Sequence, residues 1–250
     1  MDDQPLRNKV AVVTGAGRGI GKAIALAYAR SGASIGCAAR TQNEIEETAA
    51  IIRSEGGHAL AVQTDVTDPD AVAHLFETVA GHFGGIDILV INAGANYDRR
   101  IVEDSIPADW LCTAEVNLTG AYYCAHAAIP HLIKRGAGKI LLIGSGMGHR
   151  ASEGNSAYAC SKAGLWMLTR VLAQELWHSN ISVNELIPGP VVTSIDDAYP
   201  QGGTPSTVLK SPEFESEWVK EPEDVIPLAI FLAAQPEVGP TAQKIGRAHV

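Results

Sequence analysis

Near its N-terminus the chain reads KVAVVTGAGRGIG over residues 9–21. The apolar, β-branched run Val10–Thr14 predicts a strand, and a helix is expected from Gly21 onward. The glycines between them permit a tight turn and let the backbone approach a pyrophosphate, which the helix N-terminus favours electrostatically. The stretch therefore favours a dinucleotide site over an ordinary glycine-rich turn. The candidate contacts are Thr14, Gly15, Gly17, Arg18, Gly19, Ile20 and Gly21.

Strand and helix signals alternate along the rest of the chain. Further strands are expected at residues 33–39, 59–63, 86–91, 139–143 and 181–186. Helices are expected at residues 44–54, 70–83, 107–134, 157–177 and 223–233. Such alternation implies right-handed crossovers and a doubly wound parallel sheet of the Rossmann type. Because no linker interrupts the pattern, we predict a single α/β domain over residues 1–243.

The composition argues against several classes of protein. The 250 residues carry 19 Lys and Arg against 28 Asp and Glu, and a net charge of −9 argues against nucleic-acid binding. The apolar stretches are too short to span a membrane, and the start lacks a signal-peptide core. The four cysteines are scattered and the eight histidines form no compact ligand cluster. We therefore expect a cytoplasmic protein with no nucleic-acid partner, membrane segment or metal site.

The end of the second expected strand indicates which nucleotide is bound. An acidic residue there would bind the ribose 2′-hydroxyl of NAD. The chain instead reads AART over residues 38–41, and no carboxylate precedes Glu44. Arg40 and Arg18 could both pair with the 2′-phosphate of NADP through their guanidinium groups. We therefore predict NADP(H) as the preferred cofactor, with NAD(H) as the alternative.

Three residues in the second half of the chain are candidates for proton chemistry. Tyr158 and Lys162 stand four residues apart in an expected helix, so they share one face. A nearby ammonium lowers the pKa of a tyrosine, which can then exchange a proton with a carbonyl or an alcohol. Ser145 follows an expected strand, at the end where ligands of open α/β sheets bind. Its hydroxyl could hydrogen-bond the substrate oxygen.

Together, these motifs and their order resemble the classical subgroup of the short-chain dehydrogenase/reductase family, from Lys9 to Gln243. In chain order the motifs are Thr14-Gly15-x-x-x-Gly19-x-Gly21, Asp65, Asn92-Ala93-Gly94, Asn117, Ser145, Tyr158-x-x-x-Lys162 and Pro188-Gly189-Pro190-Val191-Val192-Thr193. Joint agreement at all of these positions is what makes the resemblance specific.

The resemblance implies a role for each matching residue. Tyr158 would be the acid/base, and Lys162 would lower its pKa and bind the nicotinamide ribose. Ser145 would orient the substrate, and Asn117 would help to organise a proton-relay water. The other matches would contact the cofactor: Asp65, Val66, Asn92, Ala93, Gly94, Pro188, Gly189 and Thr193.

The implied activity is that of an NADP(H)-dependent oxidoreductase interconverting a ketone and a secondary alcohol, in the reductive direction. A 3-oxoacyl thioester reductase and a sugar, polyol or xenobiotic alcohol dehydrogenase are both compatible, because a fold does not name a substrate. An alternative of another class is a catalytically silent dinucleotide-binding scaffold or sensor. The intact catalytic set argues against that alternative.

Two of the expected helices are apolar almost all round. One contains Ala121–Ala125, and the other contains Leu165–Leu168 and Val171-Leu172. A helix without a polar face needs a second partner besides its own sheet. We therefore predict a homotetramer or homodimer built on this pair of helices.

Two segments near the C-terminus stand apart. Residues 194–220 are rich in turn residues and occupy the family's substrate-lid position. After Gln243 the chain reads KIGRAHV in place of the family's last strand, and IGRAHV is also encoded by one frame of a common sequencing adapter. We expect residues 244–250 to be a non-native tail. The last edge strand would then be missing or replaced, which would leave unpaired backbone groups.

Overall fold

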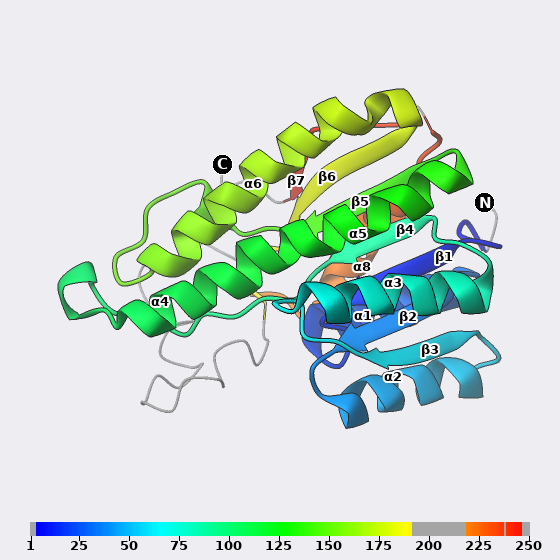
Figure 1. Ribbon diagram of the computed structural model, residues 1–250, viewed down its shortest axis with the longest axis horizontal. Helices are drawn as coiled ribbons and strands as arrows, with labels where there is room; N and C mark the ends of the chain where they lie inside the picture. The colour runs from blue at the N-terminus through cyan, green and yellow to red at the C-terminus, as the bar shows by residue number, and fades with distance from the viewer. Residues whose placement is uncertain (1–3, 192–218, 238, 247–250) are drawn as a thin grey trace.

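The computed structural model describes residues 4–191, 219–237 and 239–246, and within them seven parallel strands form one sheet. Their order across the sheet is β3-β2-β1-β4-β5-β6-β7 (Figure 1). The strands are β1 (Val10–Thr14), β2 (Ser34–Ala39), β3 (Ala59–Gln63), β4 (Ile88–Ile91), β5 (Gly138–Ile143), β6 (Ile181–Ile187) and β7 (Lys244–Gly246). The predicted doubly wound parallel α/β sheet is confirmed.

Helices cover both faces of this sheet (Figure 1). One face carries α3 (Pro69–Phe83), α5 (Gly120–Arg135) and α6 (Ser156–Leu176). The other face carries α1 (Gly19–Arg30), α2 (Gln42–Ser54) and α8 (Ile226–Ala233). A further helix, α4 (Pro107–Ala114), continues through a π-helical turn (Glu115–Thr119) into α5.

The sequence of β1 explains the two layers of helices. Val10 and Val12 pack into the core beneath α3, α5 and α6, whereas Ala11 and Val13 pack into the core beneath α1, α2 and α8. Successive side chains of a strand point to opposite faces, so a strand covered on both sides must be apolar throughout. All five residues of β1 are buried.

The strand order places an opening beside β1. This strand pairs with β2 on one side and with β4 on the other, so the connections on its two sides run in opposite directions. At such a switch point the loops beyond the carboxyl ends of the strands separate and leave a crevice for a ligand. The glycine-rich turn after Thr14 therefore lies where a ligand of this fold class binds.

The edge beyond β6 carries β7, so of the two expected alternatives, a missing or a replaced last strand, the structure has the replaced one. The three residues of β7 pair in parallel with Glu185–Ile187 of β6. Ladder hydrogen bonds are made by backbone groups, so an extended segment of almost any composition can occupy an edge. β7 is formed by part of the segment that we expect to be non-native, and that expectation stays a prediction.

Two further expectations concern the substrate lid and membrane-spanning segments. Thr193 and nearly all of the lid expected at residues 194–220 lie outside the described residues. Among the helices that the structure describes, none is long and apolar enough to cross a membrane.

Candidate active site

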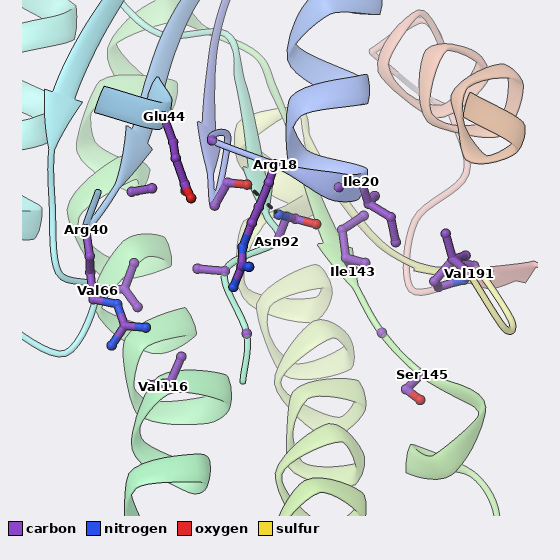
Figure 2. A pocket seen from close by; sticks show the side chains of 18 of the residues that line it. Arg18, Ile20, Arg40, Glu44, Val66, Asn92, Val116, Ile143, Ser145 and Val191 are labelled. Carbon is purple, nitrogen blue, oxygen red and sulfur yellow. Dashed lines mark hydrogen bonds between the residues drawn. The ribbon is translucent and has the colours of Figure 1, made fainter. Parts of the chain in front are cut away.

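A cavity of about 400 Å³ lies at the carboxyl ends of the central strands (Figure 2). Its wall begins at the glycine-rich turn after β1, passes the ends of β2, β4 and β5, and reaches α6 and the segment after β6. Many expected site residues line it: Gly15, Gly17, Arg18, Gly19, Ile20, Arg40, Asp65, Val66, Asn92, Ala93, Gly94, Ser145, Tyr158, Lys162, Pro188 and Gly189. The volume of the cavity and the extent of its lining suit an elongated small molecule.

The glycine-rich turn has no room for a side chain at the point where Gly21 of α1 packs against Gly15. Gly15 and Gly19 have φ angles of 65° and 54°, a region that glycine adopts without strain. A Cβ atom at Gly21 would lie 2.2 Å from the carbonyl oxygen of Gly15 and 2.4 Å from Nδ2 of Asn92. Helix α1 can therefore start directly against the turn, with its N-terminal N–H groups at the cavity.

Thr14 and Asn92 join the two central strands behind this turn. The Thr14 hydroxyl oxygen accepts hydrogen bonds from the backbone N–H groups of Asn92 (3.0 Å) and Ala93 (3.1 Å). Asn92 Nδ2 donates to the Thr14 carbonyl oxygen at 2.9 Å. Thr14 and Gly21, which we expected to contact the cofactor, support the wall from behind and do not line it.

Positive and negative side chains meet at the end of the cavity beside β2. The exposed Arg18 and Arg40 side chains both line it, and Arg40 Nη2 donates to the Tyr97 hydroxyl at 3.2 Å. Glu44, in the first turn of α2, lines the same end (Figure 2). Glu44 was not among the predicted site residues, although a residue in the first turn of a helix following β2 is placed to reach the turn after β1.

Asp65 lines the cavity from the turn that follows β3. Its Oδ1 atom accepts hydrogen bonds from the backbone N–H of Thr67 (3.0 Å) and from the Thr67 hydroxyl (2.8 Å). The carboxylate therefore orders its own turn and keeps further acceptor capacity toward the cavity.

The three candidate proton-transfer residues gather on one part of the wall. Tyr158 and Lys162 lie one turn apart on α6, with Lys162 Nζ 5.7 Å from the centre of the Tyr158 ring. Lys162 Nζ also donates to the carbonyl oxygen of Ile143 at 2.8 Å, which ties α6 to the end of β5. Ser145 Oγ accepts from the Met147 N–H at 3.2 Å and shares a side-chain hydrogen bond with Tyr158.

Burial controls the proton affinities of these groups. It raises the pKa of Tyr158, and the hydrogen bond to Ser145 and the positive charge of Arg99 oppose that rise. The net direction is upward because burial outweighs the groups that favour the phenolate, and the effect expected of Lys162 stays a prediction. Lys162 is only 4% exposed, and burial lowers its own pKa to about 8 against the opposing charge of Glu185.

Asn117 lies in the π-helical turn between α4 and α5, a feature often found at functional sites. Its side chain is buried and does not line the cavity. Asn117 Oδ1 accepts from the Ala95 N–H at 2.9 Å, and Nδ2 donates to the Ala95 carbonyl (2.8 Å) and to Ser161 (3.1 Å). The side chain thus fixes the loop after β4 to α6.

Several lining residues carry no motif that sequence reasoning could use. They lie beside motif residues on the same strand ends and turns, and they are small, apolar or common turn residues. They are Ala39, Thr41, Thr64, Val116, Ile143 and Gly144.

Comparisons with known proteins agree on one family. The family described as short chain dehydrogenase matches residues 9–202. A short-chain type dehydrogenase/reductase of Picea abies is 36% identical over 92% of this chain and 87% of its own length. A D-beta-hydroxybutyrate dehydrogenase of Rhizobium meliloti is 34% identical over 97% and 96%. The crystal structure of a short-chain type dehydrogenase/reductase from Mycobacterium marinum superposes with a TM-score of 0.86 at 32% identity, covering 98% and 95%.

Proposed function

The chain belongs to the short-chain dehydrogenase family of oxidoreductases, and from this we propose that it is an NADP(H)-dependent enzyme interconverting a ketone and a secondary alcohol. One observation carries the proposal. Tyr158, Ser145 and Lys162 line the same cavity as the glycine-rich turn, so one elongated ligand can reach both. The lack of space for a Cβ atom at Gly21 supports the proposal, because it lets α1 start directly against the turn whose backbone would face the nucleotide.

The proposed reaction divides the work between cofactor and protein. A bound nicotinamide nucleotide would supply or accept the hydride. In reduction, the Tyr158 hydroxyl gives its proton to the carbonyl oxygen of the substrate, and Ser145 donates a hydrogen bond to that oxygen. The Lys162 ammonium stabilises the resulting phenolate, and a proton from solvent later restores Tyr158.

The raised pKa of Tyr158 keeps its hydroxyl protonated at neutral pH, and this is the form that reduction uses. A tyrosine whose pKa is raised carries its proton at neutral pH and can act at once as an acid. Near pH 7 Tyr158 therefore carries the proton that reduction of a ketone needs, while the concentrations of the reactants set the net direction. Oxidation of the alcohol needs the phenolate and gains as pH rises.

A substrate panel tests the proposal directly. Purified protein is assayed with NADPH and NADH against ketones, 3-oxoacyl thioesters, oxo acids and the corresponding alcohols. Oxo acids belong in the panel because Arg99 is close enough to act on the pKa of Tyr158, so a cation stands near the reacting carbonyl. Nucleotide binding without turnover on any of these would instead support the scaffold or sensor.

We expect NADPH to bind more tightly than NADH, and the double variant Arg18→Ala, Arg40→Ala to lose that preference. A hydrogen bond to a charged group contributes about 1.5–3 kcal/mol, and about 1.4 kcal/mol is tenfold in affinity. The Kd for NADPH should therefore rise about 10- to 100-fold in a fluorescence titration. NADH lacks the 2′-phosphate and serves as the internal control, with its Kd nearly unchanged.

Glu44 supports the alternative nucleotide, NADH. Its carboxylate lines the cavity beside Gly17, where it could accept a hydrogen bond from a ribose hydroxyl. A wild-type protein that binds NADH more tightly, and loses this preference in Glu44→Gln, would replace our assignment of NADP(H).

We also propose that the protein is a homodimer or homotetramer. The exposed apolar side chains Leu111, Tyr122, Met167, Val171 and Trp177 lie on or beside α4, α5 and α6. Such a group of apolar side chains is typical of a contact surface.

Light scattering at micromolar concentration should give two or four times the mass of one chain. The double variant Met167→Lys, Val171→Lys should shift the mass toward one chain, because it places two charges in the contact. Ala73→Lys, on the exposed side of α3, adds a charge elsewhere and should leave the mass unchanged. A wild-type protein that scatters as a monomer would contradict the proposal.

A further inference from the structure

Strand β6 contains one charged residue, Glu185. Its other residues are apolar or are uncharged polar residues. The side chain of Glu185 is fully buried, with an exposed fraction of 0%. Oε2 lies 2.9 Å from Nε2 of His149, while Oε1 is buried with no hydrogen-bond partner among the described residues. Burying a carboxylate costs free energy that apolar packing would not. We therefore expect this carboxylate to have a role that offsets the cost of burying it.

The carboxylate packs directly against the end of β5. A Cβ atom at Gly144 would lie 1.9 Å from Glu185 Oε1, so the carboxylate occupies the space that any other residue at 144 would need. The neighbours of Gly144 both serve the candidate active site. The Ile143 carbonyl oxygen accepts the hydrogen bond of Lys162, and Ser145 lines the cavity beside Tyr158. Glu185 thus supports the three-residue segment Ile143–Ser145.

His149 holds the carboxylate from the other side. It follows the turn Gly146–Gly148, which begins at Ser145. Its ring packs edge-on against Trp166 of α6, with 5.6 Å between the ring centres. The pair of His149 and Glu185 therefore links the turn after Ser145 to β6 and to the helix that carries Tyr158 and Lys162.

Charge connects Glu185 to Lys162 as well. The groups that act electrostatically on Glu185 are His149 from the turn after β5, Lys162 from α6 and Lys244 from β7. The geometry places the two groups close together, because Lys162 Nζ donates to the carbonyl oxygen of Ile143 and Glu185 Oε1 packs against the next residue, Gly144. Burial favours the neutral form of Lys162, and the negative charge of Glu185 opposes it.

We propose that Glu185 is a positioning residue, which fixes the Ile143–Ser145 segment and keeps Lys162 positively charged near neutral pH. His149 orients the Glu185 carboxylate for both tasks. The inference rests on the proposed function, because it assigns Glu185 to the reaction of Tyr158, Ser145 and Lys162.

The variant Glu185→Gln tests the charge while keeping the shape and a hydrogen bond to His149. Without the carboxylate, Lys162 loses its proton at lower pH, so the alkaline limb of the kcat/KM profile should move down by about one pH unit. A shift of that size lowers kcat/KM about fivefold at pH 8 and less than about twofold at pH 6. A loss that is equal at all pH values, or no loss, would overturn the proposal.

Glu175→Gln is the matched control, because it makes the same chemical change on the exposed side of α6. Its pH profile should equal that of the wild type. If Glu185→Gln does not fold, His149→Phe and His149→Gln take its place. The phenylalanine variant should lower kcat about tenfold with an unchanged Kd for the nucleotide, and the glutamine variant should recover most of that loss. Equal kcat in these two variants would contradict the role of His149.

A measurement that needs no turnover separates this inference from the proposed function. The side-chain Cε signal of Lys162 is followed by NMR in protein labelled with ¹³C-lysine and is assigned by its loss in Lys162→Arg. In the wild type it should titrate near pH 8, and in Glu185→Gln at lower pH. An unchanged titration would refute the inference. A wild-type protein that turns over no substrate would contradict the proposed function, and the NMR titration would still decide the role of Glu185.

Discussion

Replacing Tyr158 by phenylalanine is expected to lower kcat for ketone reduction by about 10²- to 10⁴-fold, the usual contribution of a general acid. The substitution removes only the hydroxyl that hydrogen-bonds Ser145, and the ring still fills its half-buried site on α6. The nucleotide should therefore bind with nearly the wild-type Kd. Steady-state kinetics and a fluorescence titration on the same preparation give both values.

Tyr122→Phe is the control for this result. It also removes a phenolic hydroxyl, from an exposed position on α5 that is 48% exposed. Its kcat should stay within about twofold of the wild type, since Tyr122 does not line the cavity and its ring, which we place at the subunit contact, is kept. If Tyr158→Phe keeps more than about a tenth of the wild-type kcat, another group supplies the proton. If it loses nucleotide binding as well, the hydroxyl has a structural role that our account omits.

Replacing Gly21 by alanine is expected to raise the Kd for the nucleotide by up to about 100-fold. The new Cβ would stand 2.2 Å from the Gly15 carbonyl oxygen, so the glycine-rich turn must move away from α1. Overpacking of this kind costs about 1–3 kcal/mol, and part of that cost disturbs the backbone that faces the nucleotide. The melting temperature should fall together with the affinity.

Gly81→Ala is the matched control for this variant. Gly81 lies inside α3, and no heavy atom would stand within 4 Å of an added Cβ. Alanine favours the helix there by about 0.5–1 kcal/mol, so the melting temperature should rise slightly and the Kd should not change. A Gly21→Ala protein with unchanged nucleotide binding would show that the turn has more freedom than these distances allow.

The fold was predictable from the sequence because its signals are local and repeated. The third strand lies at Ala59–Gln63, as the sequence predicts, because apolar residues bounded by polar ones mark it clearly. Helix α1 starts at Gly19, two residues before its predicted start, because its first turn is formed within the glycine-rich segment itself. The three-residue β7 was not predicted, since its place depends on pairing with β6 and not on its composition.

The candidate site was only partly predictable. The glycine-rich turn and the spacing of Tyr158 and Lys162 are patterns of residues close together in the sequence. The parallel sheet brings both to the same cavity, at the carboxyl ends of its strands. The role expected for Asn117 in organising a proton-relay water stays a prediction, and no local pattern indicates that its side chain ties the loop after β4 to α6. Glu185 belongs to no motif, although a carboxylate in an apolar strand is itself an unusual signal.

The sequence by itself determined the order of strands and helices, the glycine turn and the placement of Tyr158 and Lys162 on one helix face. Each of these depends on residues close together in the chain. Only the tertiary structure decided that Lys162 bonds Ile143, 19 residues away, and that Glu185 fills the space beside Gly144. It also decided the direction of the pKa shifts of Tyr158 and Lys162, because burial from several elements removes the water that would solvate their charged forms.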